Sequence, residues 1–424
     1  KISGDVRSEW RHLAQKGRFT PFGKNNRLRG GDAVDPDGIP LSMNDFDIEA
    51  NVYFEYNTDR SWAVMQIQYD NSAGVFDSDT ACSCKLGPTS TDGDAQAITV
   101  FLNRGQCLAD PEGWHGSGNC NSVCLKKAYF GYNLYTCDDV RLDVELGRRR
   151  LNNVFDSKVQ FSSQFDGILF KYSRPGWGVD RWYLNVAGFV VNQRINQFAW
   201  IAETGWMNIM DSRVDLKYSF INWRKRGRSE CYFIEEIGVR NPRAFDFMVS
   251  QVTLAYNLRE DLLCRPAQVY GAFLMNHARH RFRYPKILSI VDSINPETGL
   301  PQRTTTFEVD TCKNANWAWY AGFKVGKVVK EGDWSIEVQY QYVQPIAVPD
   351  NDVRGICRGN VIDYTFTSVF IGNTNFKGWK FEGLYAITDN ITLDAIVEWS
   401  KAVRKNVGGQ NHYSCFKLEA IYAF

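Results

Sequence analysis

The residues of this sequence that could do chemistry are charged side chains spaced two apart and separated by apolar ones. In "VRLDVELGRRR", Arg141, Asp143 and Glu145 alternate with leucine and valine. Side chains at this spacing lie on one face of a β-strand, and the intervening ones lie on the other. A face of fixed charges in water attracts, repels or orients ions and polar solutes. We expect such faces to contain Asp5, Arg7, Glu9, Arg11, Arg141, Asp143, Glu145, Arg149, Arg213, Asp215, Lys217, Lys380, Glu382, Asp394, Glu398, Lys417 and Glu419.

Residues typical of enzymes or metal sites are poorly placed. "GWHGSGN" contains His115 and Ser117, but it lacks the G-x-S-x-G spacing of a nucleophile elbow. "DAVDPDGIP" and "VPDNDVRG" cluster carboxylates without the EF-hand spacing, which favours solvated loops over calcium sites. The sequence therefore predicts no enzyme and no cofactor. A barrel enzyme that uses His115 is an alternative.

The chain has 11 cysteines, which is unusual for a cytosolic protein and indicates an oxidising compartment. Because the number is odd, at least one cysteine cannot pair within the chain. Cys137 and Cys264 lie in short turns on the inner side, where they could bind a periplasmic partner covalently. Zinc is disfavoured, because His115 alone lies near the cysteine cluster. Internal disulfides are expected among Cys82, Cys84, Cys107, Cys120 and Cys124.

The two-residue period recurs along the whole chain and predicts about 16 antiparallel strands, or 18 if strands hide in "AQAITVFLN" or "ECYFIEEIG". Short turns join them on one side, and long connections join them on the other. The long connections are expected near 12–44, 71–124, 150–164, 222–243, 278–314 and 345–375. The strands are expected at 1–11, 45–57, 60–70, 125–135, 139–149, 165–173, 180–193, 196–207, 211–223, 244–257, 267–277, 315–329, 333–344, 376–387, 390–400 and 412–424.

Strand length separates a membrane protein from a soluble one. Many of these strands have 10 or more residues, which suits a tilted strand that crosses a bilayer, whereas soluble strands typically have about 5–6. No run of 18 apolar residues is present, mean hydropathy is −0.36, and 49 basic residues balance 48 acidic ones. This balance gives no reason to expect nucleic acid as a partner. In lipid a strand protein must close on itself, so we expect residues 1–424 to form one transmembrane antiparallel β-barrel with a polar interior. A soluble sandwich or propeller is the alternative.

Both ends of the chain fit that expectation. The sequence starts at Lys1 directly with a strand pattern, which suggests a processed start. It ends in "HYSCFKLEAIYAF", where the apolar face would meet lipid while Lys417 and Glu419 meet the interior. The terminal Phe424, together with Tyr422, resembles the signal by which outer-membrane barrels are recognised for insertion.

Several segments resemble the putative-porin family of Gram-negative outer membranes. They are "ISGDVRSEWRH", "KKAYFGYNLYTCDDVRLDVELGRRR" with "FDGILFKYS", and "GFKVGKVVKEGDWSIEVQYQYV", which continues into "VPDNDVRG" and "GNTNFKGWKFEGLYAITDNITLDAIVEWSKA". The resemblance implies a multi-pass outer-membrane porin for passive diffusion of ions and small hydrophilic solutes. It also implies homotrimers and contact with lipid and lipopolysaccharide. The number of cysteines is similar to that of the cysteine-rich porins of the chlamydial lineage.

The same resemblance implies where the channel narrows. In general porins the third long loop folds inward, which here is the connection near 150–164. We therefore expect Arg148, Arg149, Arg150 and Lys158 at the constriction, with a slight preference for anions or polar solutes. An exposed patch facing lipopolysaccharide phosphates is the alternative for these cations. The alternative for the whole protein is a disulfide-cross-linked structural or adhesive envelope protein with incidental conduction.

Overall fold

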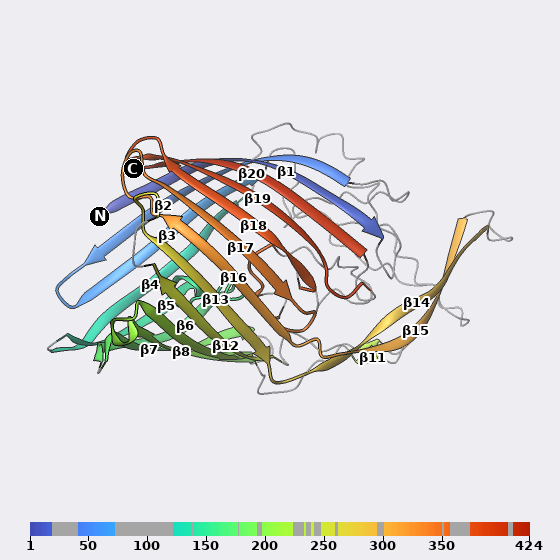
Figure 1. Ribbon diagram of the computed structural model, residues 1–424, viewed down its shortest axis with the longest axis horizontal. Helices are drawn as coiled ribbons and strands as arrows, with labels where there is room; N and C mark the ends of the chain where they lie inside the picture. The colour runs from blue at the N-terminus through green and yellow to red at the C-terminus, as the bar shows by residue number, and fades with distance from the viewer. Residues whose placement is uncertain are drawn as a thin grey trace.

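A closed barrel of sixteen antiparallel strands dominates the computed structural model of the chain (Figure 1). The first strand, β1, pairs with its neighbour β2 and also with the last strand, β20. The barrel strands thus leave no free sheet edge, which confirms the predicted transmembrane barrel and rules out a sandwich. The structure describes residues 1–18, 41–72, 122–137, 139–176, 178–192, 197–223, 233–234, 239–240, 247–258, 262–294, 301–349, 352–356, 374–405 and 410–424.

The predicted strands correspond one to one to the barrel strands, with shifted ends. The largest shift is in the first hairpin, where β1 continues to Arg18 and β2 begins at Leu41, so the first long connection is shorter than 12–44. The barrel strands are β1 (Ile2–Arg18), β2 (Leu41–Asn57), β3 (Ser61–Ser72), β4 (Ser122–Cys137), β5 (Val140–Arg150), β6 (Gln164–Gly176), β7 (Val179–Asn192), β8 (Gln197–Met207), β9 (Val214–Asn222), β12 (Met248–Asn257), β13 (Ala267–Asn276), β16 (Trp317–Gly326), β17 (Trp334–Val343), β18 (Phe376–Ala386), β19 (Ile391–Ala402) and β20 (Gln410–Ala423).

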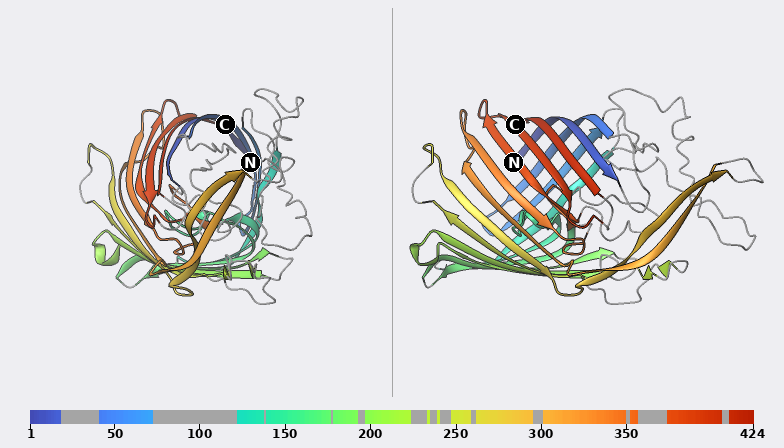
Figure 2. Two further views of the ribbon diagram at one scale, coloured as in Figure 1. Left: turned by 90° about the vertical axis from the view of Figure 1, so that its right-hand side faces the viewer. Right: turned by 45° about the vertical axis from the view of Figure 1, so that its right-hand side comes forward.

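Two small sheets lie outside the barrel. The strands β14 (Arg281–Ile294) and β15 (Pro301–Lys313) form a hairpin that extends beyond the long-connection end (Figures 1 and 2). The long connection expected near 278–314 thus contains a hairpin of its own, because these two arms pair with each other without a place in the barrel. "ECYFIEEIG" contributes only the short strand β10 (Phe233–Ile234), which pairs with β11 (Val239–Arg240). "AQAITVFLN" lies outside the described residues.

The outward face of the barrel is apolar and aromatic. Near the long-connection end, rings stack from strand to strand, with centroids 4.9 Å apart for Trp317 and Tyr342 and 5.1 Å apart for Phe381 and Trp399. Such aromatic girdles are typical of membrane barrels. Among the described residues, no helix has the length and hydropathy needed to span a membrane.

The two termini meet at the short-turn end (Figure 1). The backbone N–H of Phe424 donates to the carbonyl of Gly4 at 2.9 Å, and the reciprocal bond has the same length. Tyr422 and Phe424 are 50% and 57% exposed on the outward face. The last strand is therefore apolar outward and charged inward, as the alternation predicts.

Candidate functional site

The third long connection folds into the barrel. We call residues 151–163 the inner segment; it opens with the 3-10 turn η1 (Leu151–Asn153). The N–H of Asp156 donates to Glu203 of β8 at 3.1 Å, and the carboxylate of Asp156 pairs with Lys217 of β9 at 2.7 Å. Lys158 pairs with Glu337 of β17 at 2.6 Å. Because these barrel side chains face inward, the inner segment lies inside the barrel, as the resemblance to porins implied.

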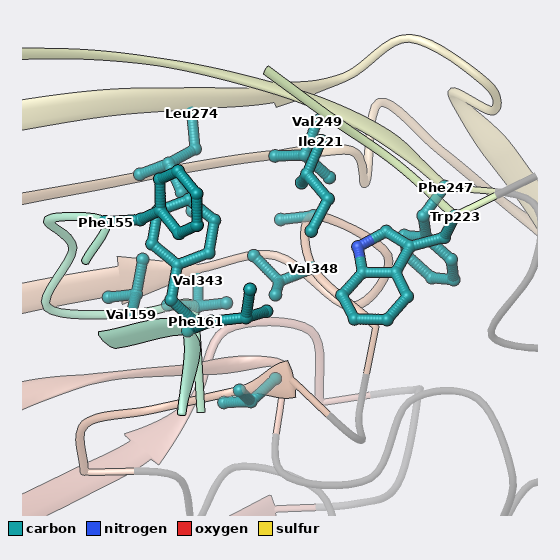
Figure 3. Close-up of a cluster of buried hydrophobic side chains, with 14 of the residues drawn as sticks. Phe155, Val159, Phe161, Ile221, Trp223, Phe247, Val249, Leu274, Val343 and Val348 are labelled. Carbon is teal, nitrogen blue, oxygen red and sulfur yellow. The ribbon is translucent and has the colours of Figure 1, made fainter. Parts of the chain in front are cut away.

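An apolar cluster fixes the inner segment against the wall (Figure 3). Phe155, Val159 and Phe161 are at most 1% exposed, and they lie beside the fully buried Leu274 of β13 and Val343 of β17. Burying each large apolar side chain contributes about 1.5–3 kcal/mol. The docked position is thus stabilised by packing as well as by ion pairs.

The same cluster corrects the expectation of a wholly polar interior. On β8, β9 and β12, the inward residues near the long connections include Ile201, Ile221 and Val249, each fully buried. The sequence contains a signal for this in "FAWIA" of β8, where both faces become apolar. Alternation of polar and apolar residues ends where the inner segment, rather than water, covers the wall.

A second segment, residues 344–349 and 352–356, meets the inner segment inside the barrel. Its Asp352 is fully buried and accepts the backbone N–H groups of Phe161 at 3.1 Å and Ser163 at 2.9 Å. Burial raises the pKa of Asp352 to about 6, although these hydrogen bonds act in the opposite direction. The prediction that "VPDNDVRG" is a solvated loop is therefore wrong. The apolar run "IAV" before it was the signal of burial.

Along β18–β20, β1 and β2 the inward face contains more carboxylates than cations. Arg7 lies 2.6 Å from Asp5, and Lys417 lies 2.5 Å from Glu9 and 2.7 Å from Glu419. We call this wall the acidic arc. Its described carboxylates are Asp5, Glu9, Asp47, Glu49, Glu55, Glu382, Asp394, Glu398 and Glu419, and its cations are Arg7, Arg11, Lys380 and Lys417.

The inward face of β4–β7 has the opposite balance, and we call it the basic arc. Here cations lie over aromatic rings, which attract them without cancelling their charge. The ring-to-cation distances are 5.5 Å for Lys127 over Tyr53, 4.6 Å for Arg149 over Tyr129, 5.5 Å for Lys171 and 5.8 Å for Arg141 over Trp62, and 5.9 Å for Arg181 over Tyr183. The carboxylates of this arc are Asp143, paired with Arg141, and Glu145, paired with Arg149 and Lys171.

Inward charged side chains remain accessible to solvent. The exposed fractions are 35% for the side chain of Arg7, 29% for Glu49, 32% for Lys171, 32% for Lys158 and 47% for Asp156. Side chains alone therefore do not fill the interior. Water can reach both arcs and the polar edge of the inner segment.

Two predicted pore residues lie elsewhere. Arg148 occupies the face of β5 opposite to Glu145 and Arg149, so it points outward, where it makes two 2.7 Å hydrogen bonds to Asp166. Arg213 lies in a short turn with φ of 63°, and its guanidinium donates to the carbonyl of Leu258 at 3.0 Å. Arg148 and Arg213 are therefore not at the constriction.

The other predicted residues lie where the strand alternation puts them. Arg150, the exposed last residue of β5, is on the same face as Arg148, so its prediction at the constriction is also wrong. Asp215 is buried and accepts the N–H of Asn208 at 2.8 Å. Lys380 lies 2.9 Å from Glu382 and 4.0 Å from Glu398 on the acidic arc. Asp394 faces inward beside Glu419.

The cysteine predictions are only partly covered by the structure. Cys124 lies on β4 rather than in the preceding connection, whereas Cys82, Cys84, Cys107 and Cys120 lie outside the described residues, as do His115 and Ser117. Cys264 is exposed in the turn between β12 and β13, and Cys415 is buried on β20. Across the described ranges, no group of three or more His, Cys, Asp or Glu residues is arranged to hold a metal ion.

Comparisons with known proteins agree with this architecture. Residues 287–412 match a family model described as putative porin, which confirms the resemblance seen in the sequence. No curated protein sequence matches the chain. Among solved structures, OprB from Pseudomonas putida aligns with a TM-score of 0.50 and 10% identity, covering 100% of this chain and 94% of that one.

Two further structures align over the whole chain with lower scores. OmpF from Salmonella typhi, in complex with daunomycin, has a TM-score of 0.46 and 11% identity and is covered to 98%. The anion-selective porin from Comamonas acidovorans has a TM-score of 0.43 and 9% identity and is covered to 99%. With the putative-porin model matching residues 287–412 and a closed barrel of sixteen strands, this chain has the fold of the outer-membrane porins.

Proposed function

We propose that this barrel is a water-filled channel for passive diffusion of ions and small hydrophilic solutes across the outer membrane. The observation that supports this best is the pair of charged, solvent-accessible arcs facing an inner segment that occupies the opposite part of the interior. A barrel of about 16 strands is wide enough to leave an aqueous channel. The inner segment narrows it without removing its wet wall.

The charge balance supports a slight preference for cations. In the acidic arc carboxylates outnumber cations, and this excess is larger than the cation excess of the basic arc. Rings and walls of fixed charge set ion preference in pores. This replaces the anion preference expected from Arg148, Arg149, Arg150 and Lys158. Arg148 and Arg150 lie on the face of β5 opposite to Glu145, and Arg149 and Lys158 are paired with carboxylates.

Recording from the purified protein in planar lipid bilayers tests the proposal. We expect discrete steps of current in potassium chloride, each from insertion of one channel or one assembly. Heat-unfolded protein, added at the same concentration, is the control for detergent effects. Insertion of folded protein without current steps would remove the proposed channel.

We further propose, from the resemblance to porins, that copies of this chain form trimers surrounded by lipid and lipopolysaccharide and that the protein has no enzymatic activity.

The exposed Cys264 at the short-turn rim supports a second role, covalent attachment to a neighbouring envelope protein. Electrophoresis without reductant separates the two roles. A Cys264→Ser variant that migrates like wild type, with both monomeric, would argue against covalent attachment.

A further inference from the structure

The second inward segment, residues 344–349 and 352–356, is anchored independently of the inner segment. The N–H of Ile346 donates to Ala315 at 2.9 Å, and its carbonyl accepts from Asn276 at 2.9 Å. The hydroxyl of Thr374 donates to the carbonyl of Pro345 at 2.7 Å. Ile346 and Val348 are at most 2% exposed. This segment is therefore a fixed support tied to the ends of β13, β16 and β18.

From this support, Asp352 reaches the returning limb of the inner segment, residues 159–163. In addition to the side-chain bonds to Phe161 and Ser163, the carbonyl of Asp352 accepts the N–H of Ser162 at 3.2 Å. Next to it, the N–H of Arg354 donates to the carbonyl of Val159 at 3.0 Å. One buried aspartate thus binds three consecutive residues of a segment about 190 positions away in the sequence.

The backbone at Phe161 provides an independent indication that this contact imposes a position. Phe161 has φ of 73°, in the left-handed region that a bulky residue rarely adopts. Such a conformation persists only where surrounding contacts hold it. Asp352 binds the N–H of Phe161, and the apolar cluster holds its ring. The two contacts together hold the unfavourable turn.

The opposite flank of the inner segment is held differently. Lys158 and Asp156 form ion pairs with wall residues. The returning limb forms none in the described residues; apolar packing and the hydrogen bond from Gln160 to Gln251 of β12, at 3.2 Å, hold it against the wall, and its backbone is fixed by Asp352, by Arg354 and by the bond from Leu151 to Ser163 at 2.9 Å. Loss of the Asp352 carboxylate would leave the N–H groups of Phe161 and Ser163 without this acceptor. The limb would then move while the flank stayed docked.

We propose that Asp352 is a positioning residue for the channel constriction: it fixes the returning limb of the inner segment and thereby the width of the water-filled passage. The effect on permeation rests on the proposed channel function. The contact between the two segments does not, so each can be tested separately.

The test compares Asp352→Ala with Asp333→Ala as a matched control. Asp333 also accepts two backbone N–H groups, from Val329 at 3.1 Å and Lys330 at 3.0 Å, but it lies in the short turn before β17. Hydrogen exchange is followed in the peptide covering residues 155–165, and open-channel current noise is recorded in planar bilayers. Peptides from the barrel strands report whether each variant is folded.

We expect exchange of the 155–165 peptide to be about tenfold faster in Asp352→Ala, which corresponds to about 1.4 kcal/mol. We expect noisier open-channel current in this variant and neither effect in Asp333→Ala. Asp352→Asn is neutral and retains one oxygen acceptor, so its 155–165 peptide should exchange more slowly than that of Asp352→Ala; it also serves if the alanine variant does not fold.

Unchanged exchange and unchanged noise in both Asp352 variants would overturn the proposal. Faster exchange without any change in current would overturn its claim about channel width. If wild-type protein passes no current while Asp352→Ala exchanges faster, the channel function fails and the contact between the segments stands. A change of equal size in Asp333→Ala would also contradict a specific role for Asp352.

Discussion

The interior of the barrel has two sides that differ in what covers the wall. On the packed side, formed by β8, β9, β12, β13, β16 and β17, the inward residues near the long connections are mostly apolar, and the inner segment covers them. On the open side, the acidic and basic arcs keep charged side chains accessible to solvent. Charged groups of the inner segment pair with single wall partners, whereas on the open side cations and carboxylates are unequal in number. Packing therefore closes one side, while unbalanced charge keeps the other side hydrated.

The largest expected effect comes from removing the cover of the packed side. Replacing residues 153–162 with a short Gly-Ser linker should raise single-channel conductance by about twofold or more, because the barrel itself is wide. Shortening the β14–β15 hairpin, which lies outside the barrel, is the control and should leave conductance unchanged. Equal conductance in both deletions would show that the inner segment does not narrow the passage.

The next prediction separates interior packing from the lipid-facing surface. Phe155→Ala removes a ring that is 1% exposed and should weaken docking of the inner segment by about 3–5 kcal/mol. Phe130→Ala removes a ring that is 56% exposed on the outward face and should cost much less. Thermal unfolding and exchange of the 155–165 peptide measure the difference. Equal effects would mean that the apolar cluster is not a core.

Much of this comparison could be predicted from the sequence, because alternation alone locates every barrel strand. Alternation also settles the face of Arg148: if Glu145 points inward, Arg149 does too, and Arg148 must point outward. In "GRRR", charged residues occupy both faces of the strand, which hides the two-residue alternation. Arg213 lies in the turn before β9 rather than on the strand. The turn has residues with positive φ, Asn208 and Arg213 among them, and these delay the start of the strand.

The role of Asp352 could not be read from the sequence. Its partners, Phe161 and Ser163, lie about 190 residues away, and the contact exists only because two long connections fold to the same place inside the barrel. The spacing of residues within one segment gives no information on a contact between two connections that are distant in the sequence. The resemblance to porins indicated that one connection folds inward, and the second became visible only in the structure.

A pH prediction follows from the raised pKa of Asp352, which burial moves to about 6. The docked state binds the proton of Asp352 more tightly than an exposed aspartate of pKa about 4 does. The free energy of docking is therefore most favourable below pH 4. It becomes less favourable, by up to about 3 kcal/mol, as the pH rises through 6. Exchange of the 155–165 peptide, corrected for its intrinsic pH dependence, should therefore be faster at pH 7 than at pH 5. Asp352→Asn should lack this difference, and its persistence there would assign the effect to another group.

The smallest expected effect distinguishes the two arcs of the open side. Glu49→Gln should lower the cation-to-anion permeability ratio, and Lys127→Gln should raise it, each by roughly 1.5-fold. Glu331→Gln, in the exposed turn before β17, is the control and should leave the ratio unchanged. Shifts of the same sign in the two arc variants would contradict the assignment of opposite charge to the two arcs.

The reversal potential of wild-type protein in a potassium chloride gradient tests the open side most directly, because it requires a conducting passage and reports the sign of its fixed charge. The carboxylate excess of the acidic arc predicts a reversal potential with the sign of weak cation selectivity. Anion selectivity, or the absence of current from correctly folded protein, would contradict this account of the interior.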